Sequence, residues 1–211
     1  MRALLVCVIY LLFSTGEVSP QNVEIFGENY YKETKTFVMD EYTYQCDVQP
    51  KSQFVTLYNK ENKWTYENQV YKNTGKYYAP SISEERKLNP IVDDAEMTRK
   101  TLNIVDNAFT QFMAKQMGKK RFVITMFLDP ETGKVAEVRF NFATFSPYAK
   151  VPLSVYRNIE VQLKENISYT PTTVGKQLNY IMLSWSQTPI GRHNLVLPPV
   201  DSIDEPFTVI E

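Results

Sequence analysis

Cysteine and histidine are almost missing from this chain of 211 residues, which contains two Cys and one His. Cys7 lies in a leading segment that we expect to be removed, so Cys46 is the only thiol that stays and no internal disulfide can form. Tyr42, Tyr44 and Val48 recur with Cys46 at every second position, as on one face of a strand. We therefore predict that Cys46 is a small buried side chain.

The motifs of common catalytic and metal centres are missing as well. There is no H-x-x-x-H, C-x-x-C, D-x-D-x-D-G, G-x-S-x-G, P-loop or G-x-G-x-x-G run. The lone His193 stands in a loop-like stretch, and the strand context of Cys46 argues against a Cys–His pair. We predict no catalytic, cofactor-binding or metal-binding residues and a protein that is not an enzyme. A carboxylate pair of the glycosidase type stays as the alternative.

A charge excess is absent too. The net charge is -1, the pI is about 6.0, and no five like charges stand in a row. Nucleic-acid phosphates are bound by clustered Lys and Arg side chains, so nucleic acid is not an expected partner.

Apolar runs long enough to cross a membrane are also absent. The longest, Ala3–Phe13, has 11 residues and spans about 16 Å as a helix, against about 30 Å of hydrocarbon. With Arg2 before it and small residues after it, this run is typical of a secretory signal peptide over residues 1–20. We expect an exported protein, periplasmic or extracellular, with no stable membrane span.

The remaining chain is divided by its patterns. Residues 21–80 are predicted to be a β-rich block, a meander of strands at Thr36–Val48, Phe54–Tyr58 and Trp64–Tyr71, since aromatic and polar residues alternate there. Residues 81–92 are polar and predicted to be a connector. Residues 191–211, with several prolines, are predicted to be an extended tail.

The segment 93–190 is predicted to be an α+β unit. A helix begins at Asp93–Asp94 and ends at Gly118, two strands at 121–128 and 135–142 flank a tight turn, a second helix covers Pro152–Asn166, and a strand covers Gln177–Trp185. The order is α-β-β-α-β.

This order resembles the C-terminal domain of TonB-type energy transducers over residues 93–185. The motif residues that carry the resemblance are Asp129, Gly133 and Lys134 in the first turn and Pro171, Gly175 and Lys176 in the crossover. The resemblance implies a helix on an antiparallel sheet whose edge pairs with extended peptides, either the tail or a partner. A transducer also needs a membrane anchor and a Pro-rich spacer, so energy transduction is not expected. The whole chain also resembles small uncharacterised exported proteins of Bacteroidetes.

Aromatic side chains suggest a binding surface. Adjacent residues of an extended chain point to opposite sides, so one member of each tyrosine pair is expected to be exposed. The candidate surface consists of Tyr30, Tyr31, Trp64, Tyr77 and Tyr78. We expect a non-enzymatic binding or envelope-associated protein whose partner is an envelope protein, a peptide or a glycan. The alternative is a small hydrolase of glycans that acts through a carboxylate pair.

Overall fold

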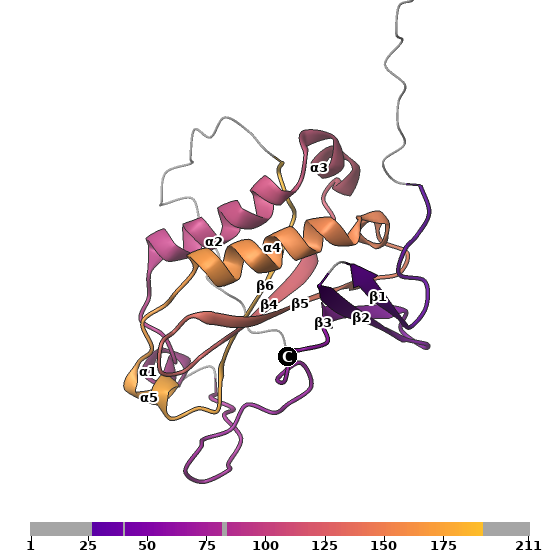
Figure 1. The fold of residues 1–211 in the computed structure, drawn as a ribbon. Coiled ribbons are helices and arrows are strands. Elements are labelled where there is room, and N and C mark those ends of the chain that lie inside the picture. Colours follow the sequence, from indigo (N-terminus) through magenta and orange to yellow (C-terminus); the bar gives the residue numbers. More distant parts are fainter. Residues whose placement is uncertain (1–26, 40, 82–83, 192–211) are drawn as a thin grey trace, which may run out of the picture.

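The computed structural model describes residues 27–39, 41–81 and 84–191. One antiparallel sheet of six strands, in the order β1-β2-β3-β5-β4-β6, forms its centre. The helices α2 and α4 lie side by side over one face of that sheet (Figure 1). The strands are β1 (Lys35–Met39), β2 (Tyr42–Gln49), β3 (Phe54–Asn59), β4 (Phe122–Leu128), β5 (Val135–Ala143) and β6 (Ile181–Gln187). The helices are α1 (Glu85–Leu88), α2 (Ala95–Ala108), α3 (Gln111–Met117), the 3₁₀ helix η1 (Pro147–Lys150), α4 (Leu153–Asn166) and α5 (Thr173–Lys176).

The α+β class predicted from the sequence is confirmed. The β4–β5 hairpin and α4 lie within one residue of their predicted bounds, because each carries a clear periodicity and a clear stop. Asp94 caps α2 as predicted, accepting a 2.8 Å hydrogen bond from the backbone N–H of Met97.

Three predicted elements differ from the structure. Thr36–Val48 is a hairpin, since β1 ends at Met39 and β2 begins at Tyr42, with the weak strand formers Asp40 and Glu41 between them. The long helix breaks at Phe109, whose backbone is extended, and Thr110 caps a new helix, α3. The last strand begins at Ile181, after the short helix α5.

The prediction of a strand at Trp64–Tyr71 is wrong. That stretch is a loop, with isolated bridges only at Val70 and Tyr71. Its aromatic residues alternate as in a strand, but tertiary contacts described below hold the loop across the sheet instead.

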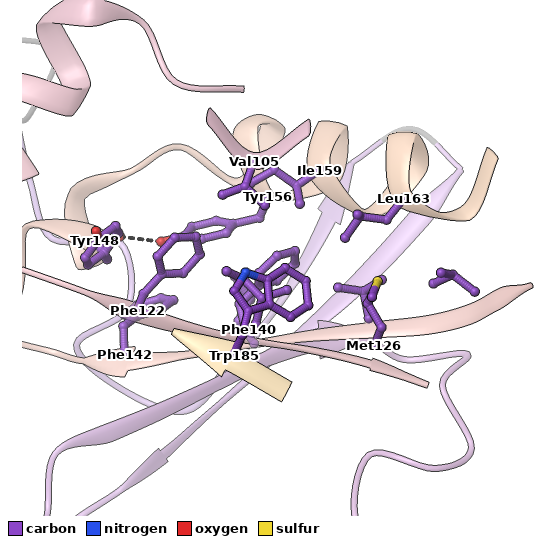
Figure 2. Packing of buried hydrophobic residues seen from close by; sticks show 14 of the residues in the cluster. Val105, Phe122, Met126, Phe140, Phe142, Tyr148, Tyr156, Ile159, Leu163 and Trp185 are labelled. Carbon is purple, nitrogen blue, oxygen red and sulfur yellow. Dashed lines mark hydrogen bonds between the residues drawn. The ribbon is translucent and has the colours of Figure 1, made fainter. Parts of the chain in front are cut away.

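The core fills the space between the helices and the sheet. Tyr156 and Ile159 of α4 point toward Phe122 and Phe140 of the sheet (Figure 2). The Tyr156 hydroxyl lies at full burial and donates a 2.8 Å hydrogen bond to the backbone carbonyl of Tyr148. A buried phenol hydroxyl needs a hydrogen-bond partner, and the carbonyl of Tyr148 supplies it inside this largely apolar core.

The sheet also joins the two parts into which the sequence pattern divides the chain. Phe54 to Tyr58 of β3 pair with Arg139 to Ala143 of β5 in register. The N-terminal strands therefore share one sheet and one core with the segment 93–190. No helix in the described part of the chain is long and apolar enough to span a membrane.

Candidate functional site

The face of the sheet opposite to α2 and α4 carries the loop that follows β3. Both carboxylate oxygens of Glu137 accept backbone N–H groups of this loop, from Lys63 at 2.6 Å and from Trp64 at 2.9 Å. The guanidinium of Arg139 donates a 2.5 Å bond to the carbonyl of Thr65. Two charged side chains of β5 thus fix the loop, because hydrogen bonds with one charged member are the stronger kind.

Aromatic stacking holds the same loop from a second side. The indole of Trp64 stacks on the ring of Tyr180, with 5.3 Å between centroids and 28° between planes. Tyr180 in turn meets Phe127 of β4 edge-on, and its hydroxyl donates a 2.5 Å bond to the carbonyl of Glu67. Trp64 is half-buried and fixed in orientation.

A pocket of about 260 Å³ opens beside Trp64. Its walls combine one indole with carboxylates, ammonium groups and an amide. The lining residues are Glu61, Asn62, Lys63, Trp64, Ala136, Glu137 and Lys164. We call this hollow the Trp64 pocket. Side chains of both charge signs leave its walls without a strong preference for an anion or a cation.

Lys164 connects the pocket with a buried carboxylate on α4. Its ammonium lies 2.7 Å from Oε1 of Glu160, and the guanidinium of Arg157 lies 3.2 Å from Oε2. Glu160 is fully buried and also accepts the hydroxyl of Tyr44. Burial raises the pKa of the Glu160 carboxyl, and the ammonium of Lys164 opposes that rise.

A second polar cluster lies near the outer end of the loop. Tyr66, 64% exposed, donates a 2.5 Å hydrogen bond to Oδ2 of Asp47, and Tyr58 donates to the same oxygen at 3.0 Å. Burial, and then the bond to Asp47, raises the pKa of Tyr58 to about 12 and also raises that of Tyr66. Gln45 donates to the other Asp47 oxygen at 2.8 Å, so this carboxylate is fully engaged.

The structure separates the five aromatic residues that were grouped from the sequence. Tyr31 is fully buried and packs on the ring of Phe37, so it is not part of any surface. Tyr30 is 37% exposed, and its backbone N–H donates a hydrogen bond to the carbonyl of Ala149 in η1.

The second pair lies elsewhere. Tyr77 is 69% exposed, whereas Tyr78 is half-buried against Tyr71 and bonded through its hydroxyl to the carbonyl of Leu88 in α1. The two tyrosine pairs and Trp64 therefore have different packing partners, namely η1 and Phe37 for the first pair, Tyr71 and α1 for the second, and Tyr180 for Trp64. Of the five residues, Trp64 is the one that lines the pocket described above.

The turn residues that carried the TonB resemblance stabilise the local backbone conformation. Asp129 accepts backbone N–H groups from Glu131 and Thr132, which closes the β4–β5 turn before Lys134 and lowers the pKa of Asp129. Gly133 has φ +70°, and a Cβ there would lie 1.7 Å from the carbonyl oxygen of Tyr169.

The crossover after α4 is equally crowded. A Cβ on Gly175 would lie 2.0 Å from the carbonyl oxygen of Pro90, and Pro171 forms a bridge with Ile91. Lys176 is an exposed residue at the end of α5. Gly133, Pro171 and Gly175 therefore have a structural role, because they allow the hairpin turn and the crossover to lie close to neighbouring backbone.

Sequence reasoning missed the partners of Trp64. Glu137 and Arg139 stand on β5 and Lys164 on α4, more than seventy positions away from the loop. Alternation on β5 places Glu137 and Arg139 on one face, which was a signal that two charges there need partners. Nothing in the sequence indicated that the partners are backbone groups of a distant loop.

Reactive groups in the described residues are few. Burial raises the pKa of the Cys46 thiol to about 12, and the side chain is fully buried, as predicted. No group of three His, Cys, Asp or Glu side chains within the described ranges could hold a metal ion. His193 and the leading segment 1–20 lie outside those ranges.

A family model covers most of the chain. Residues 28–185 match the model described as "Domain of unknown function (DUF5043)". The chain belongs to the DUF5043 family. The match runs through the β-rich block, the connector and most of the α+β segment, and it does not confirm the TonB resemblance.

A solved structure supports the same assignment. The crystal structure of a DUF5043 family protein from Bacteroides uniformis shares 59% identity with this chain, with a TM-score of 0.74. The alignment covers 79% of this chain and 97% of that one. No curated protein sequence matches the chain.

Proposed function

We propose that this DUF5043 protein is an exported, non-enzymatic binding protein that holds a glycan in the Trp64 pocket. The observation that carries the proposal is the stacked indole at the wall of a pocket lined by carboxylate, ammonium and amide groups. Sugar rings pack their C–H faces on aromatic rings, while hydroxyls exchange hydrogen bonds with polar side chains of either sign.

Preorganisation supports this assignment. The indole of Trp64 is held by the ring of Tyr180, and its backbone N–H is bonded to Glu137, so binding would cost little ordering of the side chain. Asn62 is fixed in the same way, since its amide donates a 3.0 Å bond to the carbonyl of Val138.

The alternative is hydrolysis of a glycan by the two carboxylates that line the pocket, Glu61 and Glu137. Both oxygens of Glu137 already accept backbone N–H groups of the loop, from Lys63 and from Trp64. A general acid or base must reach the substrate with its own oxygen, and both oxygens of Glu137 are engaged by the backbone, so this arrangement favours binding over hydrolysis.

Export to the periplasm or the extracellular space belongs to the proposal and depends on the signal-like segment 1–20. The TonB-like interpretation of residues 93–190 also stays a proposal. It is compatible with the order of α2, β4, β5, α4 and β6 along the chain. An association with other envelope components would agree with both.

The test uses the chain from residue 21 to 211 on arrays of envelope and host glycans, followed by calorimetry with the retained glycans. Trp64→Ala should weaken binding at least about tenfold, the equivalent of about 1.4 kcal/mol. Tyr77→Ala, which removes an exposed aromatic ring outside the pocket, is the matched control and should bind like the parent chain.

Two outcomes would overturn the proposal. If the protein binds no glycan on the arrays, the proposed ligand class is wrong. Released sugar products that disappear in Glu61→Gln would show the hydrolase instead. Because Trp64→Ala also removes a packing contact, Lys63→Ala on the same wall is measured beside it, and both variants are compared with the parent by circular dichroism.

A further inference from the structure

A second hollow, of about 400 Å³, lies between the two long helices. Ile104, Asn107 and Ala108 line it from α2, and Asn158 and Gln162 line it from α4. These helices lie side by side in Figure 1, with the sheet beneath them. We call this hollow the α2–α4 groove. It is distinct from the Trp64 pocket, whose lining residues are all different.

The lining of the groove has one chemical character. Three carboxamides stand around two aliphatic side chains, and no charged residue lines it. A carboxamide both donates and accepts hydrogen bonds, as a peptide unit does, so it can bond to the backbone of an extended segment. Aliphatic side chains of that segment would cover Ile104 and Ala108. The groove therefore fits an uncharged, apolar, extended peptide.

The described chain ends near the C-terminal end of α2, one of the two helices that line this groove. After β6 the backbone N–H of Ile190 donates a 3.2 Å bond to Oδ1 of Asp106 in α2. A Cβ on Gly191 would lie 2.9 Å from the Cα of Gln111, the first residue of α3. Figure 1 shows this last piece, in yellow, rising between α2 and α3. Three Cα steps separate Gln111 from the groove residue Ala108, so the two lie at most about 11 Å apart.

The sequence that follows has the chemistry of the groove. Residues 192–211 lie outside the described part, and Asn194–Leu197 among them reads Asn-Leu-Val-Leu, without a charge. Pro198 and Pro199 follow at once, and their fixed φ favours an extended chain with little entropy left to lose. Three residues span up to about 10 Å, which is comparable to the largest separation of Gln111 and Ala108.

We propose that Asn194–Leu197 of the same chain docks in the α2–α4 groove. Leu195 and Leu197 face alike in an extended segment and cover Ile104 and Ala108, while Asn158 and Gln162 bond to the backbone between them. The inference is independent of glycan binding, because the Trp64 pocket takes no part in it.

The direction of the chain favours the groove over the outer edge of β6, the last strand of the sheet in the described part of the chain. Gln187 at the end of β6 donates to the carbonyl of Leu102 at 3.0 Å, and the hydroxyl of Thr188 donates to Lys120 at 2.9 Å. Pro189 is buried. These contacts lead the chain from the sheet toward the helices, whereas pairing with β6 would need an immediate reversal.

Hydrogen exchange of the chain 21–211 tests the proposal. The amides of Asn194–Leu197 should exchange at least about tenfold more slowly than an unstructured peptide, the equivalent of about 1.4 kcal/mol. Residues 202–211 serve as the internal reference. Asn158→Arg, which puts a long charged side chain into the groove, should abolish this protection. Glu165→Arg, an exposed change on the same helix outside the groove, should leave it intact.

A pair of tail variants separates docking from damage to the helices. Leu195→Asp with Leu197→Asp should abolish protection, and Phe207→Asp with Val209→Asp, at the same spacing further along the tail, should not. Exchange at the unstructured rate in the parent chain overturns the proposal. Protection that survives Asn158→Arg, or that is lost together with protection of the β6 amides, overturns it too and assigns the segment to another surface.

Discussion

The backbone N–H of Trp64 donates a 2.9 Å hydrogen bond to Oε2 of Glu137, a residue 73 positions further along the chain. The N–H of Lys63 donates to the other oxygen of the same carboxylate at 2.6 Å. Glu137 is almost fully buried, so its charge is compensated by these donors and not by water. One side chain of the sheet thereby fixes the wall of the candidate site.

Glu137→Gln should loosen this wall. The amide keeps one acceptor oxygen and opposes a second N–H with its own NH₂ group, so the free energy of unfolding should fall by about 1–3 kcal/mol. Urea unfolding measures the loss, and faster exchange of the Lys63 and Trp64 amides locates it. Glu61→Gln changes an exposed carboxylate of the same pocket and should stay within about 0.5 kcal/mol. Equal unfolding midpoints for the two variants would contradict the assignment.

Gly133→Ala should be among the most destabilising small substitutions in the chain. Its Cβ would meet the Tyr169 carbonyl oxygen at 1.7 Å, in a backbone conformation with φ +70°. We expect a loss of at least about 4 kcal/mol, measured by thermal and urea unfolding. Gly75→Ala has a similar φ, +67°, with open space around the Cβ, and should cost only about 1–2 kcal/mol. If both variants lose equal stability, the positive φ alone explains the need for glycine at position 133, and the contact with Tyr169 does not contribute.

Glu160 should make stability depend on pH. Because burial raises its pKa, the folded protein binds this proton more tightly than the unfolded chain does. The resulting stability is complete below the ordinary value of 4.5 and is lost as the pH rises through the folded-state pKa.

Relative to Glu160→Gln, the parent chain should therefore lose stability as the pH rises from 4.5 toward neutrality. Urea unfolding of both proteins across this range measures the difference. Glu165→Gln, an exposed change on the same helix, should leave the pH profile unaltered. A parent chain that gains stability relative to Glu160→Gln as the pH rises would show that Arg157 and Lys164 outweigh burial.

Asp47→Asn should bring the pKa of Tyr58 down from about 12 toward its ordinary value of 10. The carboxylate accepts a hydrogen bond from the phenol and repels the phenolate, and the amide removes that repulsion while the effect of burial stays. Ring resonances of Tyr58 and Tyr66 followed by NMR above about pH 9 measure the change. Asp93→Asn, which has no tyrosine partner among the described contacts, is the control. An unchanged Tyr58 titration would assign its shift to burial alone.

Elements set by interactions between near neighbours in the sequence could be predicted, whereas elements set by distant residues could not. The hairpin of β4 and β5 and the helix α4 were predictable, because periodicity and turn residues act over a few positions. The strand predicted at Trp64–Tyr71 failed at a loop whose place is decided by Glu137, Arg139 and Tyr180. Local alternation could not show that these distant partners would capture the backbone.

The sequence by itself determined the α+β class, the burial of Cys46, and the absence of common catalytic motifs, since each depends on residue type and near neighbours. Only the tertiary structure decided that Tyr31 is buried in the core and that Trp64 lines a pocket with Lys164. Exposure and pocket walls depend on how strands and helices far apart in the chain are packed. That packing is set by the burial of the whole core, and no short stretch of sequence contains it.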